Sequence, residues 1–76
     1  MIKYQLSFLS VLIIEDNEET RGHLVDVLQL YFETVLFAVD GCDGLKKVEA
    51  STPDVIISDI RMPCLNGIEF VKKIKK

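Results

Sequence analysis

Two kinds of hydrophobic spacing alternate along this chain of 76 residues. Near-continuous apolar residues occupy positions 11–14 and 55–57, and positions 34–39 are rich in β-branched and aromatic side chains. We therefore predict strands over residues 11–14, 34–39 and 54–58. Strands with unbroken apolar runs are typical of parallel sheets that are covered on both faces.

Helical spacing follows each predicted strand. The first helix begins at residues 17–19 with acidic side chains in its first turn, where they suit the helix macrodipole. A shorter helix is expected over about residues 42–50, weakened by Gly44 by about 1 kcal/mol relative to alanine, and a third begins near residues 66–67. The expected inward-facing residues are Leu24, Val27, Leu28 and Tyr31 in the first helix, Leu45 and Val48 in the second, and Phe70, Val71 and Ile74 in the third.

The alternation of strands with helices predicts one small α/β domain. Strands that alternate with helices form a parallel sheet with right-handed crossovers. The length allows a single domain, and the apolar fraction of 49% is enough for a packed core. We expect residues 1–10 to form a leader and residues 11–76 to form three βα units.

Composition excludes several other classes of protein. The formal charge of −3 disfavours nucleic acid as a direct partner. The apolar run over residues 6–14 is too short to span a bilayer and has no small-residue cleavage site, so we expect no membrane segment. Cys42 and Cys64 do not make a disulfide framework, and we interpret them as reduced thiols in a cytoplasmic protein.

Three carboxylates follow two of the predicted strands. Glu15 and Asp16 come directly after residues 11–14, and Asp59 comes directly after residues 54–58. Ligands of open parallel sheets bind beyond the carboxyl ends of the strands. Since three crowded anions repel one another unless a cation joins them, this pattern favours a divalent metal at that edge.

Each of the three acids also has a structural interpretation. Asp16 could cap the first helix, because Asp16 and Glu19 have the spacing of a capping box. Glu15 could be a solvated charge at a strand end, and Asp59 taken alone could be a turn residue.

The segment around Asp59 resembles a known family. Residues 59–67 read Asp-Ile-Arg-Met-Pro-Cys-Leu-Asn-Gly, an Asp-x-x-Met-Pro-x-x-x-Gly pattern preceded by the acidic pair Glu15-Asp16 at the end of another strand. Because of these motifs, residues 11–76 resemble the receiver domain of two-component response regulators. The Pro53-Asp54 pair and the Ala38-x-Asp40-Gly41 segment are also similar to that family.

The resemblance implies a flavodoxin-like parallel sheet with helices on both faces, and a phosphoacceptor rather than an enzyme. Asp59 would accept a phosphoryl group from a histidine kinase, with Mg²⁺ held by Asp16, by Asp59 and by the backbone carbonyl of Arg61. Glu15 would lie close to the metal or bind it through water. The change would pass to an output domain or a downstream protein.

The chain departs from the family in the number of its units. The family has five βα units in strand order 2-1-3-4-5, and this sequence has three, so we expect a fold truncated after the third. The serine or threonine of the fourth strand and the lysine of the fifth have no counterpart, because neither Thr52 nor Lys75 ends a suitable strand. We therefore expect weak Mg²⁺ binding and slow phosphorylation at most.

Two alternatives follow from this departure. The third strand would become an unpaired edge, so a homodimer could form through it, and the chain could be a non-catalytic self-associating fragment or interaction module. A hydrolase of the haloacid dehalogenase type is disfavoured, since it needs a second aspartate where Arg61 stands.

Overall fold

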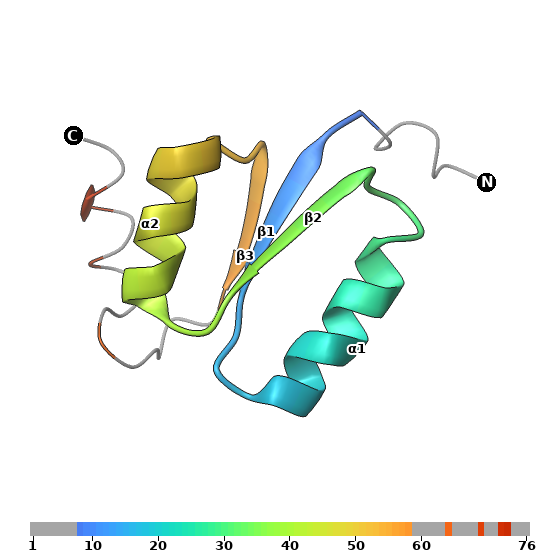
Figure 1. Ribbon diagram of the computed structural model, residues 1–76, viewed down its shortest axis with the longest axis horizontal. Helices are drawn as coiled ribbons and strands as arrows, with labels where there is room; N and C mark the ends of the chain where they lie inside the picture. The colour runs from blue at the N-terminus through green and yellow to red at the C-terminus, as the bar shows by residue number, and fades with distance from the viewer. Residues whose placement is uncertain (1–7, 59–63, 65–68, 70–71, 74–76) are drawn as a thin grey trace.

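The fold is a parallel sheet with a helix on each face (Figure 1). The computed structural model describes residues 8–58, 64, 69, 72 and 73. Along the described chain the elements are β1 (Ser10–Ile14), α1 (Glu18–Leu28), β2 (Thr34–Ala38), α2 (Gly41–Ser51) and β3 (Val55–Ser58). The predicted strands and the first two predicted helices are all confirmed; the boundaries of the strands and of α2 differ by one residue, and α1 ends three residues before Tyr31.

The described sheet has the strand order β2-β1-β3, and both pairings are parallel. Ser10 belongs to β1, so the strand begins inside the predicted leader. At the start of the sheet, Asp54 Oδ2 accepts hydrogen bonds from Ser10 N at 2.8 Å and Ser10 Oγ at 3.2 Å. Asp54 N donates in return to Ser10 O at 3.1 Å, which aligns β3 with β1 before their first ladder pair.

Strand β1 forms the centre of the core. Its last four residues, 11–14, are at most 1% exposed. This explains why the run is apolar at every position, since a central strand covered on both faces has no solvent side. Leu12 and Ile14 form a buried cluster with Ala38, and α2 packs against this cluster through Cys42, Leu45 and Val48. The predicted inner face of the second helix is therefore confirmed.

Helix α1 covers the opposite face less completely. None of its residues is fully buried, and its less exposed residues are Arg21, Leu24, Val25 and Leu28. The prediction of Val27 as an inward residue is wrong, because Val27 is 53% exposed. The spacing of positions 21, 24, 25 and 28 shows the reason: the face toward the sheet is rotated toward Val25. Tyr31, also predicted on this helix, lies beyond its end.

The two cysteines are joined. A disulfide links Cys42 to Cys64, with Cα atoms 5.9 Å apart, so the prediction of reduced thiols is wrong for this structure. Sequence spacing could not show this pairing, since it depends on the sheet topology. The chain enters α2 and leaves β3 at the same edge, which brings residues 22 positions apart within bonding reach.

The predicted third helix is only partly within the described residues. Glu69, Lys72 and Lys73 have helical backbone, whereas the predicted inward-facing Phe70, Val71 and Ile74 lie outside the described residues. Among the described residues, no helix has the length and apolar character needed to cross a membrane.

Candidate functional site

The carboxyl ends of all three described strands meet at one edge of the sheet. Ile14 of β1 pairs in register with Ala38 of β2 and with Ser58 of β3. The chain leaves this edge at Glu15 after β1 and at Val39 after β2, and the residue after Ser58 in the sequence is Asp59. We call the end of β1 and the two residues that follow it, Glu15 and Asp16, the acidic edge.

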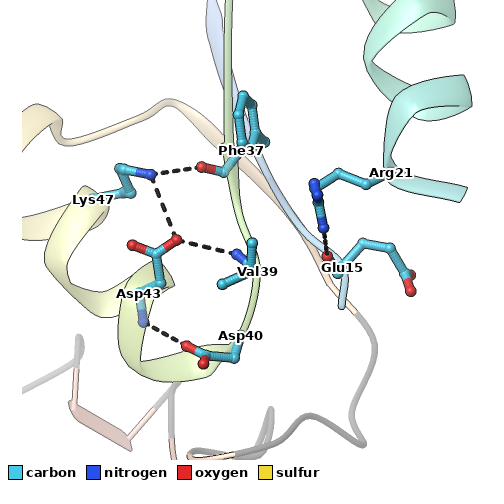
Figure 2. Close-up of polar contacts among 7 residues, drawn as sticks. All are labelled: Glu15, Arg21, Phe37, Val39, Asp40, Asp43 and Lys47. Atoms are coloured by element: carbon cyan, nitrogen blue, oxygen red, sulfur yellow. Dashed lines mark hydrogen bonds and ion pairs between the residues drawn. The ribbon is translucent and has the colours of Figure 1, made fainter. Parts of the chain in front are cut away.

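Glu15 is held in place mainly by its backbone. Its N–H donates to the carbonyl of Ala38 at 3.1 Å, which continues the β1–β2 ladder by one step. Its carbonyl accepts a hydrogen bond from Arg21 Nη1 at 2.9 Å, across a partly buried gap between β1 and α1 (Figure 2). Glu15 Oε2 accepts from the backbone N of Asn17 at 3.1 Å. The carboxylate therefore turns back over the entrance to α1.

Asp16 is exposed and is not the cap of α1. Asn17 is the N-cap, and its Oδ1 accepts from Thr20 N at 2.8 Å. The capping interpretation of Asp16 is therefore wrong, because the helix begins one residue later than the Asp16–Glu19 spacing suggests. Within the described part of the chain, the Asp16 carboxylate has no hydrogen-bond or ion-pair partner.

Arg21 also contacts this edge, and the sequence analysis did not predict it. Besides holding the Glu15 carbonyl, its guanidinium lies 5.5 Å from the centroid of the Phe37 ring. Lys47 Nζ lies 5.6 Å from the same ring and donates to the Phe37 carbonyl at 2.7 Å (Figure 2). Two cations therefore flank one half-exposed aromatic ring, an arrangement worth about 0.5–1 kcal/mol for each exposed contact. The helical spacing of Arg21 with Leu24, Val25 and Leu28 was the available signal.

The entrance to α2 is fixed by its own hydrogen bonds. Asp40 is the N-cap, and its Oδ1 accepts from Asp43 N at 2.8 Å. Asp43 Oδ2 accepts from Val39 N at 3.1 Å and forms an ion pair with Lys47 at 3.6 Å (Figure 2). These contacts join the first turn of α2 to the end of β2, and they stabilise the start of the helix beside the edge.

Two of the four predicted metal ligands lie in the described structure. Glu15 and Asp16 are adjacent at the end of β1, while Asp59 and Arg61 lie outside the described residues. Considering the described residues alone, no three histidine, cysteine, aspartate or glutamate side chains gather closely enough to hold a metal ion. The acidic edge offers the carboxylate oxygens of Glu15 and Asp16, and oxygen donors of this kind fit a hard cation such as Mg²⁺. His23 is exposed on α1.

Comparison with known proteins gives one consistent family. The family model described as the response regulator receiver domain matches residues 11–76. Among curated proteins, the chain is 38% identical over 65 residues to hybrid signal transduction histidine kinase D of Dictyostelium discoideum, covering 86% of this chain and 4% of that protein. It is 41% identical over 70 residues to a protein-glutamate methylesterase/protein-glutamine glutaminase of Thermotoga maritima, covering 90% of this chain and 20% of the relative.

Solved structures give the same result. The chemotaxis response regulator CheY4 of Vibrio cholerae superimposes with a TM-score of 0.83 at 36% identity, over 91% of this chain and 57% of the other. The response regulator domain of Thermotoga maritima CheB gives a TM-score of 0.79 at 40% identity, over 87% and 51%. The chain thus spans about half the length of these solved chains and a fifth or less of the two curated relatives.

Proposed function

The chain belongs to the response regulator receiver domain family, and from this premise we propose that it is a phosphoacceptor modified on Asp59. The donor would be a phosphohistidine of a histidine kinase, and the readout would be an output domain or a downstream protein. One curated relative is itself named a histidine kinase, which supports this partner. The proposal covers the site and its partners, since the chain spans only part of each relative.

The observation that carries the proposal is the register of the sheet. Ile14 and Ser58 are partners in adjacent parallel strands. The residues that follow them in the sequence are Glu15-Asp16 and Asp59. Parallel strands deliver the residues after their carboxyl ends to one crevice, where ligands of open α/β sheets bind. A register shifted by several residues would remove this support.

Each side chain has a defined role in the proposal. A carboxylate oxygen of Asp59 attacks the phosphorus, an O–P bond forms, and the P–N bond to the kinase histidine breaks. Asp16, Asp59 and the Arg61 carbonyl would hold Mg²⁺, with Glu15 close to the ion or bound through water, and the ion would neutralise charge on the phosphoryl oxygens. Arg21 would orient the acidic pair, because its hydrogen bond to the Glu15 carbonyl fixes the backbone where Glu15 and Asp16 follow β1.

A polypeptide of these 76 residues is proposed to react slowly. The resemblance places a phosphoryl-contacting lysine and a switch hydroxyl on later strands of the family fold, and neither has a counterpart in this sequence. This polypeptide would therefore lack one cation that opposes the phosphoryl charge in the family, and Mg²⁺ would have to neutralise more of that charge.

Intact mass spectrometry after incubation with acetyl phosphate and Mg²⁺ tests the site. We expect slow gain of one phosphoryl group in the parent chain and no gain in Asp59→Asn. Asp26→Asn is the matched control, because Asp26 is exposed on α1 away from the edge. Phosphorylation of Asp59→Asn at the parent rate would refute the assignment of Asp59.

The metal ligands are tested with the same assay. Asp16→Asn should abolish the dependence of the rate on Mg²⁺, because it removes one of the carboxylates proposed to bind the ion. Glu15→Gln should have a smaller effect, since Glu15 Oε2 already accepts a hydrogen bond from Asn17. An Asp16→Asn protein with an unchanged Mg²⁺ dependence would remove Asp16 from the ligand set.

A second candidate function, self-association, is supported by the position of β3. Within the described sheet β3 pairs only with β1, so its other side is an edge. Ile57 on this strand is 38% exposed. Unpaired apolar edges are templates for another strand, and a two-fold dimer could form by antiparallel β3 pairing. Sedimentation velocity at micromolar concentration tests this: Ile57→Lys should convert dimer to monomer, and a monomeric parent chain would exclude the dimer.

A further inference from the structure

Strand β2 forms one border of the described sheet, because within that sheet it pairs with β1 on one side only. Residues 34–39 read Thr-Val-Leu-Phe-Ala-Val, without charge, proline or glycine. Segments of this composition have high β-propensity and pair readily with copies of themselves. A strand at the border of a sheet also presents a row of unpaired N–H and C=O groups. The border at β2 is therefore a surface to which another strand can add.

The ladder identifies the backbone groups that point away from the sheet. Ala38 O accepts a hydrogen bond from Glu15 N at 3.1 Å, so the backbone groups of Ala38 point toward β1. This direction alternates along a strand. The outward N–H and C=O groups are therefore those of Val35, Phe37 and, just beyond the strand, Val39. We call these outward groups the β2 edge.

Side chains of α2 cover two groups of the β2 edge. Lys47 Nζ donates to the Phe37 carbonyl at 2.7 Å, and Asp43 Oδ2 accepts from Val39 N at 3.1 Å (Figure 2). Lys47 and Asp43 also form an ion pair with each other at 3.6 Å, one helical turn apart. A carbonyl and an N–H that a new strand would use are thus already occupied.

The border of the sheet at Phe37 is also flanked by positive charge. The Phe37 side chain points to the opposite face from Ala38, since side chains alternate along a strand. Helix α2 packs on the face of Ala38, yet Lys47 Nζ lies 5.6 Å from the centroid of the Phe37 ring. Lys47 therefore reaches across the border, and the Arg21 guanidinium of α1 lies 5.5 Å from the same ring.

A second copy of this chain is the partner whose fit the structure defines. In an antiparallel pair of β2 strands about a two-fold axis at Phe37, each Phe37 N–H would donate to the Phe37 carbonyl of the other copy. Lys47 occupies that carbonyl. The same axis would bring the Lys47 ammonium groups of the two copies together, and like charges repel. Lys47 thus opposes this pairing by hydrogen bonding and by charge.

We propose that the Asp43–Lys47 pair closes the β2 edge to a second copy of this chain, and that loss of the Lys47 ammonium opens this edge to antiparallel β2 pairing. Charged side chains, lysine above all, protect edge strands in this way. The ion pair itself is weak, because its side chains are 39% and 33% exposed. The protection comes from the place that Lys47 occupies, since pairing would leave its charge without partners beside the new strand.

Lys47→Met tests the proposal, because methionine keeps an apolar stem and removes the ammonium. Lys46→Met is the matched control, since it makes the same change of charge at the neighbouring, exposed residue. Hydrogen exchange of the outward amides of Val35 and Phe37, followed by NMR across a dilution series, reports pairing at this edge. In Lys47→Met this exchange should slow at about tenfold lower protein concentration than in the parent or in Lys46→Met, since the Phe37 carbonyl is free to accept.

Two further variants at the same position sharpen the test. Lys47→Arg keeps a cationic donor and should behave as the parent does. Lys47→Gln is uncharged and one atom shorter, so it should behave as Lys47→Met and replaces it if far-ultraviolet circular dichroism shows that Lys47→Met is unfolded. Sedimentation velocity should show a larger mass for the uncharged variants than for the parent at the same concentration.

The exchange pattern also separates the β2 edge from the other border of the sheet. Equal concentration dependence in Lys47→Met and Lys46→Met would overturn the proposal, because Lys47 would then have no special position. Slower exchange confined to residues 55–58 would overturn it as well, since β3 would then carry the association. None of these measurements depends on phosphorylation of Asp59, so the phosphoacceptor assignment stands or fails separately.

Discussion

Replacing Leu12 with alanine tests whether β1 is the centre of the fold. Leu12 is completely buried and belongs to the cluster that joins β1, β2 and α2. Leu12→Ala removes three carbon atoms from this cluster. At about 0.8 kcal/mol for each buried CH₂, the lost transfer free energy is about 2.4 kcal/mol. A residual cavity adds to this, so we expect a loss of about 3 kcal/mol of unfolding free energy.

Leu30→Ala is the matched control, since the same atoms are removed from a side chain that is 64% exposed. Its expected cost is about 0.5 kcal/mol or less, as for most surface substitutions. Urea unfolding followed by far-ultraviolet circular dichroism, with the disulfide kept oxidised, measures both variants. With a slope of about 1 kcal/mol per molar urea, Leu12→Ala should lower the midpoint by about 3 M.

The total stability of a chain this short sets the scale of that loss. At 0.05–0.15 kcal/mol per residue, we expect roughly 4–11 kcal/mol for the whole domain. Leu12→Ala would therefore remove a large fraction of it, and a parent at the low end would leave a largely unfolded variant. Equal midpoints for Leu12→Ala and Leu30→Ala would refute the assignment of β1 as the buried central strand.

Three further substitutions test local contacts of the same structure. Asn17→Ala removes the cap of α1 and should lower the free energy of unfolding in urea by about 1 kcal/mol. Asn17→Asp keeps an acceptor and should retain most of the stability. Equal losses in the two variants would show that the 2.8 Å hydrogen bond from Thr20 N does not contribute. Asp54→Ala removes the carboxylate that accepts from Ser10 and should lower the free energy of unfolding by about 1 kcal/mol. An unchanged urea midpoint would mean that water replaces these hydrogen bonds. Arg21→Met keeps the apolar stem but loses the hydrogen bond to the Glu15 carbonyl, so it should lower the free energy of unfolding by about 1–2 kcal/mol. It should also weaken Mg²⁺ binding in calorimetric titration. An unchanged Mg²⁺ affinity would contradict a positioning role for Arg21.

Much of the architecture could be predicted from the local pattern of side chains. The unbroken apolar run at residues 11–14 indicated a strand covered on both faces, and β1 is that strand. The acidic residues after Asn17 indicated a helix start, and α1 begins there. Such signals are local, because strand and helix periodicity and capping chemistry involve residues only a few positions apart.

The candidate site, too, was predicted in part from the sequence, and the structure supplied the rest. The sequence pattern indicated Glu15, Asp16 and Asp59 as candidates, and the family resemblance added the carbonyl of Arg61. It did not show that Arg21 holds the Glu15 carbonyl, or that Asp16 leaves capping to Asn17. These contacts depend on where α1 meets the sheet, and a rotation of the helix by one residue would exchange the side chains on its inner face.

The sequence alone thus indicated the order of the described strands and helices, the family, and the candidate residues of the acceptor site. Only the tertiary structure decided the register that makes Ile14 and Ser58 neighbours, the exposure of Val27, and the bond between Cys42 and Cys64. The physical reason is distance along the chain. Pairs such as Cys42 and Cys64 are 22 positions apart, and only packing of the sheet and helices brings such pairs together.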